Sequence, residues 1–322
     1  MMAGCTTAAA ASGALIVLNK SDHNAALVDP ETHKVLLTLP TGQGPHEAAV
    51  SPDGSLAYVS NYGAFAVFRQ GERPQMQRGN SITVLDLKAR AVKATFDLGE
   101  HLMPHGLWVS RDGSRLWVTT EAVQSVLELD AASGKILKVW KTGQNVSHMV
   151  VPTPDEKKLY ISNIGSGSAT VIDRTNDSVK TIPTGPGAEG IDISPNGREV
   201  WVTNRAAGTI SVIDVATDQV VVSFTSGGQF PIRAKFTPDG KQVFVSNAQS
   251  NSVAVFDAAS RQLIGTIAVG AVPVGIQMTP DGKRAYVANT NDNKVTLVDV
   301  AKREVVTSFT TGNEPDGMAW AK

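Results

Sequence analysis

A four-residue turn recurs along the chain at nearly constant intervals, and it restricts the fold more than any other feature. The turn reads SPDG at residues 51–54 and returns as SRDG, TPDE, SPNG, TPDG and TPDG. Its third residues are Asp53, Asp112, Asp155, Asn196, Asp239 and Asp281, which gives intervals of 59, 43, 41, 43 and 42 residues. Such a period is typical of a repeat architecture in which every copy is one supersecondary unit.

Each repeat contains four short segments with strand character. In residues 189–226 these are EGIDIS, EVWVTN, GTISVID and QVVVSFTS, rich in Val, Ile, Thr and aromatic residues and separated by turn residues. Four antiparallel strands in every period of this length predict a propeller blade. The chain is therefore expected to be all-β.

The two ends of the sequence supply the parts of one more blade. Residues 14–42 match strands two to four of a blade, and the C-terminal PDGMAWAK matches strand one. Pairing them closes the ring and removes two exposed sheet edges. We therefore predict one seven-bladed β-propeller domain over residues 14–322, closed by this clasp, with residues 1–13 as a tether.

The ends of the second strands carry a family resemblance. YVSNYG, YISNIG, WVTNRA, FVSNAQ and YVANTN, each after a turn of the Pro-Asp-Gly type, resemble the YVTN-repeat seven-bladed propellers of bacterial envelope proteins over about residues 14 to 321. More distantly, the chain is similar to propeller lactonases, a streptogramin-opening lyase and the propeller domain of nitrous oxide reductase. The resemblance implies the fold, and because this fold supports many activities it leaves the function open.

Composition removes several classes of function. The formal net charge is −1 with no basic run, so no nucleic-acid partner is expected. The chain has one cysteine and no C-x-x-C-H, so neither a disulfide within the chain nor covalent haem is expected. GPGAEG at residues 185–190 fits G-x-G-x-x-G, but no helix follows, so no nucleotide site is expected. We expect a monomer.

The first residues suggest a cellular location. Met2-Ala3-Gly4 precedes the single Cys5, and a Thr- and Ala-rich stretch follows, as in a bacterial lipobox. An arbitrary run of small residues is the alternative. The lipobox interpretation predicts a periplasmic or cell-envelope lipoprotein that meets the membrane only through a lipid anchor.

The repeats also serve as an internal control, because a residue found in nearly every blade is needed to build a blade. An Asp ends the third strand in all seven copies and is expected to accept hydrogen bonds from the following turn. An Asn ends the second strand in six of them and is expected to satisfy loop backbone. The positions are Asp29, Asp86, Asp130, Asp173, Asp214, Asp257 and Asp299 for the first set, and Asn19, Asn61, Asn163, Asn204, Asn247 and Asn289 for the second.

The residue at the start of the first strand behaves differently and marks the candidate site. The first strand is innermost in a propeller, so its start lies at one end of the central channel, which we call the mouth. In ring order the seven residues are Asp316, His46, His105, His148, Glu189, Ile232 and Val274. We call the first five of these the arc.

Imidazole and carboxylate groups together are typical ligands of transition metals. We therefore predict a divalent transition-metal ion, of unspecified identity, held by His46, His105 and His148. Glu189 and Asp316 are predicted as further ligands or as acid–base groups. Two alternatives stay open, a ligand site without metal and an inert lining of a wet channel.

A second ring follows the second strands and opens on the same face. Lys20, Tyr62, Glu121 and Arg205 stand one position beyond the second strand, and Arg233 follows Ile232. Glu121 is predicted as a catalytic group and the others as ligand-binding residues. A cationic patch opposite the histidines would suit a carboxylate or another small anion, although ordinary rim charges explain these residues equally well.

The long interval in the repeat places an insertion of about residues 64–79 beside the same mouth. Phe65 and Arg69 within it are predicted to contact the ligand, and the segment is predicted to act as a lid. A tolerated surface insertion is the alternative.

Together these features predict a cell-envelope propeller that binds a small molecule, with a divalent metal, at one mouth. If it is an enzyme, the chemistry is that of a metal-assisted lyase, lactonase or other hydrolase. The alternative function is a non-enzymatic scaffold that binds another protein.

Overall fold

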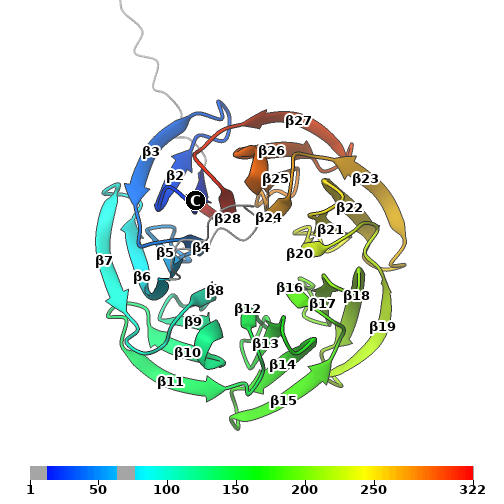
Figure 1. Cartoon of the computed structure of the whole chain (residues 1–322), viewed down its shortest axis with the longest axis horizontal. Helices are drawn as coiled ribbons and strands as arrows, with labels where there is room; N and C mark the ends of the chain where they lie inside the picture. The colour runs from blue at the N-terminus through cyan, green and yellow to red at the C-terminus, as the bar shows by residue number, and fades with distance from the viewer. Residues whose placement is uncertain (1–12, 64–76, 322) are drawn as a thin grey trace, which may run out of the picture.

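Seven four-stranded antiparallel sheets surround a central axis in the computed structural model, which describes residues 13–63 and 77–321 (Figure 1). The blade that contains both chain ends has the strand order β28-β1-β2-β3, and every other blade is formed by four consecutive strands. The predicted seven-bladed propeller is therefore confirmed.

From the axis outward, each blade begins with its innermost strand. The closing blade has β28 (Pro315–Ala321), β1 (Ala14–Asn19), β2 (Asn24–Val28) and β3 (Val35–Pro40). Next come β4 (Pro45–Val50), β5 (Leu56–Gly63), β6 (Arg78–Asp86) and β7 (Ala91–Asp97). The third blade has β8 (Pro104–Val109), β9 (Arg115–Thr120), β10 (Ser125–Asp130) and β11 (Ile136–Lys141).

Four blades complete the ring. They are β12 (Ser147–Pro152), β13 (Lys158–Asn163), β14 (Ser168–Asp173) and β15 (Ser178–Pro183), then β16 (Ala188–Ile193), β17 (Glu199–Asn204), β18 (Thr209–Asp214) and β19 (Gln219–Thr225). Then follow β20 (Pro231–Phe236), β21 (Gln242–Asn247), β22 (Ser252–Asp257) and β23 (Leu263–Ala268). The last are β24 (Pro273–Met278), β25 (Arg284–Asn289), β26 (Lys294–Asp299) and β27 (Glu304–Phe309).

The burial of each strand follows from its radial place. Second and third strands are packed between neighbouring blades on both faces, so β17 and β18 are almost wholly buried. Outermost strands meet solvent on one side, and β19 alternates between exposed and half-buried residues. Two short 3-10 turns, η1 (Glu121–Val123) and η2 (Thr290–Asp292), follow β9 and β25. No helix in the described ranges has the length and hydrophobicity needed to cross a membrane.

The predicted clasp is present. β28 pairs antiparallel with β1, with Leu15 opposite Trp320 and Val17 opposite Met318. Leu15, Val17 and Met318 are buried in one apolar cluster, against which Trp320 packs. The strand therefore supplies both the ladder and part of the core of the closing blade.

The two repeated polar positions have structural roles. All seven aspartates accept hydrogen bonds from backbone N–H groups of the following turn, as predicted; Asp29, for example, accepts from Glu31 and Thr32 at 2.9 and 2.8 Å. Asn61 accepts the N–H of Gly42 at 3.0 Å, as predicted, but it also donates to the hydroxyls of Ser81 and Thr83. The asparagines thus join the second strand to the third as well as to the loop.

Candidate functional site

The five residues of the arc lie at the second position of adjacent innermost strands, and all are buried or nearly so. Three imidazole rings follow one another around the axis. The rings of His46 and His105 meet edge to face with centroids 4.7 Å apart, and those of His105 and His148 lie 3.7 Å apart. The expectation that these residues are neighbours at the mouth agrees with this geometry.

Glu121 joins this group from η1, directly after β9. Its Oε1 lies 2.5 Å from Nδ1 of His148, and its Oε2 accepts the hydroxyl of Tyr62 at 2.5 Å. Tyr62 in turn stacks on His46 with ring centroids 4.7 Å apart. One ligand atom from each of His105, Glu121 and His148 lies within 4.8 Å of the other two. The closest potential metal-binding group therefore consists of two imidazoles and a carboxylate.

The other members of the arc form ion pairs at its two ends. At one end Lys20 Nζ lies 2.8 Å from Asp316 Oδ2, which also faces His46 Nε2 at 3.9 Å. At the other end Arg205 Nη1 donates to Glu189 Oε2 at 2.8 Å. The predicted cationic patch opposite the histidines is therefore not formed, because each cation sits beside an acid of the arc. This pairing follows from the cost of burying an unpaired charge.

Burial controls the protonation of the three histidines. It lowers the pKa of His46, His105 and His148 well below the usual 6.5, and nearby positive groups such as Lys20 for His46 and Arg233 for His148 act in the same direction. The rings are therefore neutral at neutral pH. A neutral imidazole is the form that binds a metal ion. Nδ1 of His105 is buried without a hydrogen-bond partner among the described residues, so it can accept such a bond.

The carboxyl groups shift in the opposite direction. Burial raises the pKa of Glu121 above its usual 4.5, although His105 and Tyr62 oppose the shift. Burial likewise raises the pKa of Glu189 to about 7, against the effect of Arg205. Glu189 Oε1 lies 3.8 Å from Nε2 of His148. A carboxyl group that titrates near neutral pH beside an imidazole is suited to accept or donate a proton.

Not every predicted ligand-binding residue lies at the mouth. Arg233 points one layer deeper into the channel, where it donates to Glu47 and to Met149 Sδ. It follows Ile232 on β20, so the alternation along the strand sends its side chain below the mouth. Phe65 and Arg69, predicted for the lid, lie outside the described residues.

Sequence analysis missed Glu47 and Met149. A signal for them exists one position further along the first strands, where the ring-order residues are Gly317, Glu47, Gly106, Met149, Gly190, Arg233 and Gly275. Glycine alternates there with a long side chain, so this ring also departs from the constant pattern of a scaffold position.

The family of the chain follows from comparison with known proteins. The model of the YNCE-like beta-propeller family matches residues 75–281, so the chain belongs to that family. No curated protein matches the sequence.

Solved structures extend the likeness in fold. The periplasmic gluconolactonase PpgL of Pseudomonas aeruginosa is 19% identical with a TM-score of 0.74, over 96% of this chain and 99% of its own. Hydrazine synthase of Kuenenia stuttgartiensis is 21% identical with a TM-score of 0.71, over 85% and 88%. A protein of unknown function from Desulfotomaculum acetoxidans is 12% identical with a TM-score of 0.80, over 96% and 99%. At these identities the likeness concerns the propeller alone.

Proposed function

We propose that this propeller binds one divalent transition-metal ion at the mouth and uses it to bind a small molecule. The observation that carries the proposal is the group formed by His105, Glu121 and His148, whose ligand atoms lie within 4.8 Å of one another. Two ligand atoms that are each about 2.1 Å from one ion are about 3–4 Å apart, so small side-chain shifts bring these three into coordination range. Two imidazoles and a carboxylate suit zinc, iron, manganese or cobalt and leave positions for water or substrate.

The surrounding groups support the binding of a metal. Nδ1 of His148 faces Glu121 and its Nε2 faces Glu189. When Nδ1 coordinates the ion, the ring proton moves to Nε2, where Glu189 can accept it. Carboxylates in this position fix the orientation of a metal-bound histidine and raise its basicity. Arg205 holds Glu189 in place through its own hydrogen bond at 2.8 Å. His46 and Asp316 form the adjoining wall of the site.

Arg205 also suggests the class of ligand. Its side chain is 27% exposed at the edge of the site and spends one guanidinium N–H on Glu189. The remaining donors suit a carboxylate or another small oxyanion. An ion bound beside it would polarise a carbonyl or activate a water molecule, which favours hydrolase or lyase chemistry. PpgL, a periplasmic gluconolactonase of the same fold, is compatible with such an activity.

The proposed location is the cell envelope. It rests on the sequence of Met2-Ala3-Gly4-Cys5, which lies outside the described residues. Lipidation of Cys5 would tether the propeller to the membrane surface and leave the mouth free for small molecules.

Titration of the metal-free protein with zinc chloride tests the proposed site. Wild type should bind one ion, and Glu121→Gln should weaken binding by about 100-fold or more because it removes a charged ligand. Asp316→Asn is the matched control, since Asp316 is a buried carboxylate of the same mouth outside the three-residue group. It should change the affinity by less than about fivefold. Equal losses in both variants, or zinc binding that survives in Glu121→Gln, would contradict the assignment of ligands.

The pH dependence of zinc binding should report Glu189. Its pKa of about 7 means that the carboxyl group loses its proton as the pH rises through neutrality. An ionised carboxylate beside the ion attracts it, so the affinity of wild type should rise between pH 6 and 8. The histidines should contribute little there, because their pKa values already lie well below 6.5. The sequence alone predicts a fall through the histidine range, and the burial of these rings moves that contribution to lower pH.

Glu189→Gln is the variant that tests this assignment. Isothermal titration of wild type and Glu189→Gln across this pH range, in buffers of matched ionic strength, should show that the rise is lost in the variant. The variant should also impair any reaction that needs a base. An unchanged pH profile would exclude Glu189 as the titrating group.

A further inference from the structure

Beneath the mouth, one layer of side chains crosses the channel. In the ring that follows the arc, Glu47, Met149 and Arg233 alternate with glycines. The glycines let neighbouring inner strands approach closely: a Cβ on Gly317 would lie 2.0 Å from the carbonyl oxygen of His46, and one on Gly106 would lie 2.7 Å from that of His148. The narrow ring leaves room for three long side chains only.

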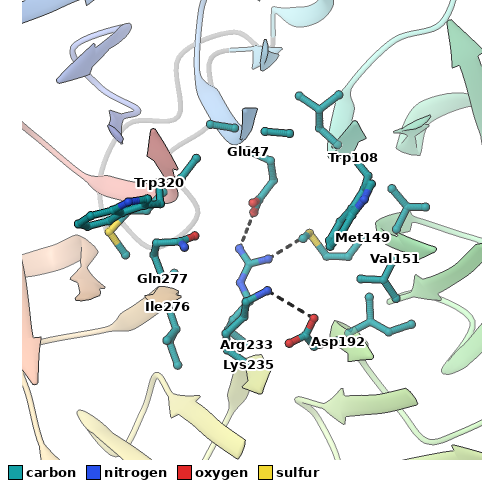
Figure 2. Close-up of a pocket in the computed structure, with 18 of the residues that line it drawn as sticks. Glu47, Trp108, Met149, Val151, Asp192, Arg233, Lys235, Ile276, Gln277 and Trp320 are labelled. Atoms are coloured by element: carbon teal, nitrogen blue, oxygen red, sulfur yellow. Dashed lines mark hydrogen bonds and ion pairs between the residues drawn. The ribbon is translucent and has the colours of Figure 1, made fainter. Parts of the chain in front are cut away.

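These three side chains contact one another. Arg233 comes from β20 and donates through Nη2 to Glu47 on β4 and through Nη1 to Met149 Sδ on β12 at 3.3 Å, as Figure 2 shows. The side chains of Arg233 and Glu47 are only 12% and 10% exposed. We call Glu47, Met149 and Arg233 the partition. It separates the mouth from the rest of the channel.

A cavity of about 330 Å³ lies on the far side of the partition. Its lining includes the three partition residues but none of the five residues of the arc. Five further side chains of the inner strands surround it, and the same five line an adjoining opening that continues to the SPDG-type turns at Pro195, Pro238 and Pro280. They are Trp108, Asp192, Lys235, Gln277 and Trp320, all labelled in Figure 2. The channel therefore has a second chamber that opens on the face opposite the mouth.

The polar groups of this chamber have more hydrogen-bond donors than acceptors to spare. Asp192 already accepts the backbone N–H of Phe236 at 2.8 Å and faces Lys235 Nζ at 3.4 Å. Within the described residues, Lys235 Nζ has no other hydrogen-bond partner, so most of its three N–H donors are available. Arg233 likewise uses only two of its five donors, those to Glu47 and Met149. A ligand rich in acceptors would satisfy these groups.

The walls supply the apolar part of the recognition. Trp108 and Trp320 are half-buried on different sides of the cavity, and Ile276 and Val151 lie between the polar groups (Figure 2). Flat indole surfaces suit an aromatic or branched aliphatic group. A chamber with apolar walls and a few converging donors is the usual form of a small-molecule site.

We propose that this chamber is a second ligand site, separate from the metal site, and that it binds a small organic carboxylate with an aromatic or branched body. Lys235 contacts the carboxylate, and Trp108 with Trp320 packs against the body. The partition keeps this ligand from reaching the mouth, so the two sites are occupied independently.

Benzoate is a suitable probe, with benzamide as a neutral molecule of the same shape. Binding to the full chain is followed by isothermal titration and by tryptophan fluorescence. Wild type should bind one benzoate and bind benzamide at least about tenfold more weakly, since the charged contact is lost. Lys235→Met should weaken benzoate by about tenfold or more, whereas Lys235→Arg, which retains the charge, should stay within about threefold of wild type.

Arg205→Met is the matched control, because it removes a cation from the mouth and leaves the chamber intact. It should leave benzoate affinity unchanged. The proposal is overturned if Arg205→Met rather than Lys235→Met abolishes binding, if benzamide binds as well as benzoate, or if no benzoate binds at concentrations up to about 20 mM. Because neither readout uses a metal, this test can fail or succeed whatever the outcome at the mouth.

Discussion

Deletion of residues 315–322 should abolish the stable fold. The deletion removes β28, which pairs with β1 and buries Met318, Ala319 and Ala321. It would also expose the edge of β1 and the apolar faces of the two neighbouring blades. The expected loss is comparable with the whole stability of a typical domain, about 5–15 kcal/mol. Circular dichroism during heating should show no cooperative transition above room temperature.

A rearranged chain separates loss of the clasp from loss of the sequence itself. Ala321 lies opposite Ala14 at the outer end of the β28–β1 pair. Residues 315–321 can therefore be moved ahead of Gly13 and joined to it by a two-residue hairpin turn. This variant should recover most of the wild-type melting temperature. A deletion variant that melts like wild type would mean that the assigned closure does not hold the ring together.

Substitution of His105 by alanine should remove metal binding with only a small effect on stability. His105 provides one of the three closest ligands and its ring lies between those of His46 and His148. Loss of one of three protein ligands should lower affinity by about 1,000-fold or more. The ring belongs to none of the apolar clusters that surround the described strands, so the metal-free protein should lose only about 1–2 kcal/mol.

His33 offers the matched control. It occupies the turn between β2 and β3, where it stacks on Phe309 rather than on the arc. Its φ of 58° lies in the left-handed region, so His33→Asn is preferable to alanine. This variant should retain wild-type zinc affinity. If His105→Ala and His33→Asn bind zinc equally well, His105 is not a ligand.

Much of the architecture could be predicted because it is repeated. Recurring copies of the same turn specify the blades, and the complementary ends specify the closure. The same comparison distinguishes the constant Asp29 position, which builds turns, from the variable His105 position. Repetition therefore separates scaffold from candidate site without any other sequence.

The partnerships within the site could not be predicted in this way. Spacing gives the height of a residue along the inner strand, but not which neighbour its side chain meets. Spacing places Lys20 opposite the histidines, yet the cost of burying its charge is met by pairing with Asp316. Glu121 is predicted as a catalytic group, and η1 brings it into direct contact with His148. Arg233 lies below the mouth because of the alternation along β20.

Metal content of the purified protein tests the central claim most directly. Wild type, His105→Ala and His33→Asn would be expressed without an affinity tag, supplemented in turn with zinc, manganese, iron, copper, nickel and cobalt, and measured by inductively coupled plasma mass spectrometry. The account predicts about one equivalent of one of these metals in wild type and His33→Asn, and almost none in His105→Ala. Clearly substoichiometric metal in wild type under all six conditions, with all three proteins folded, would contradict it.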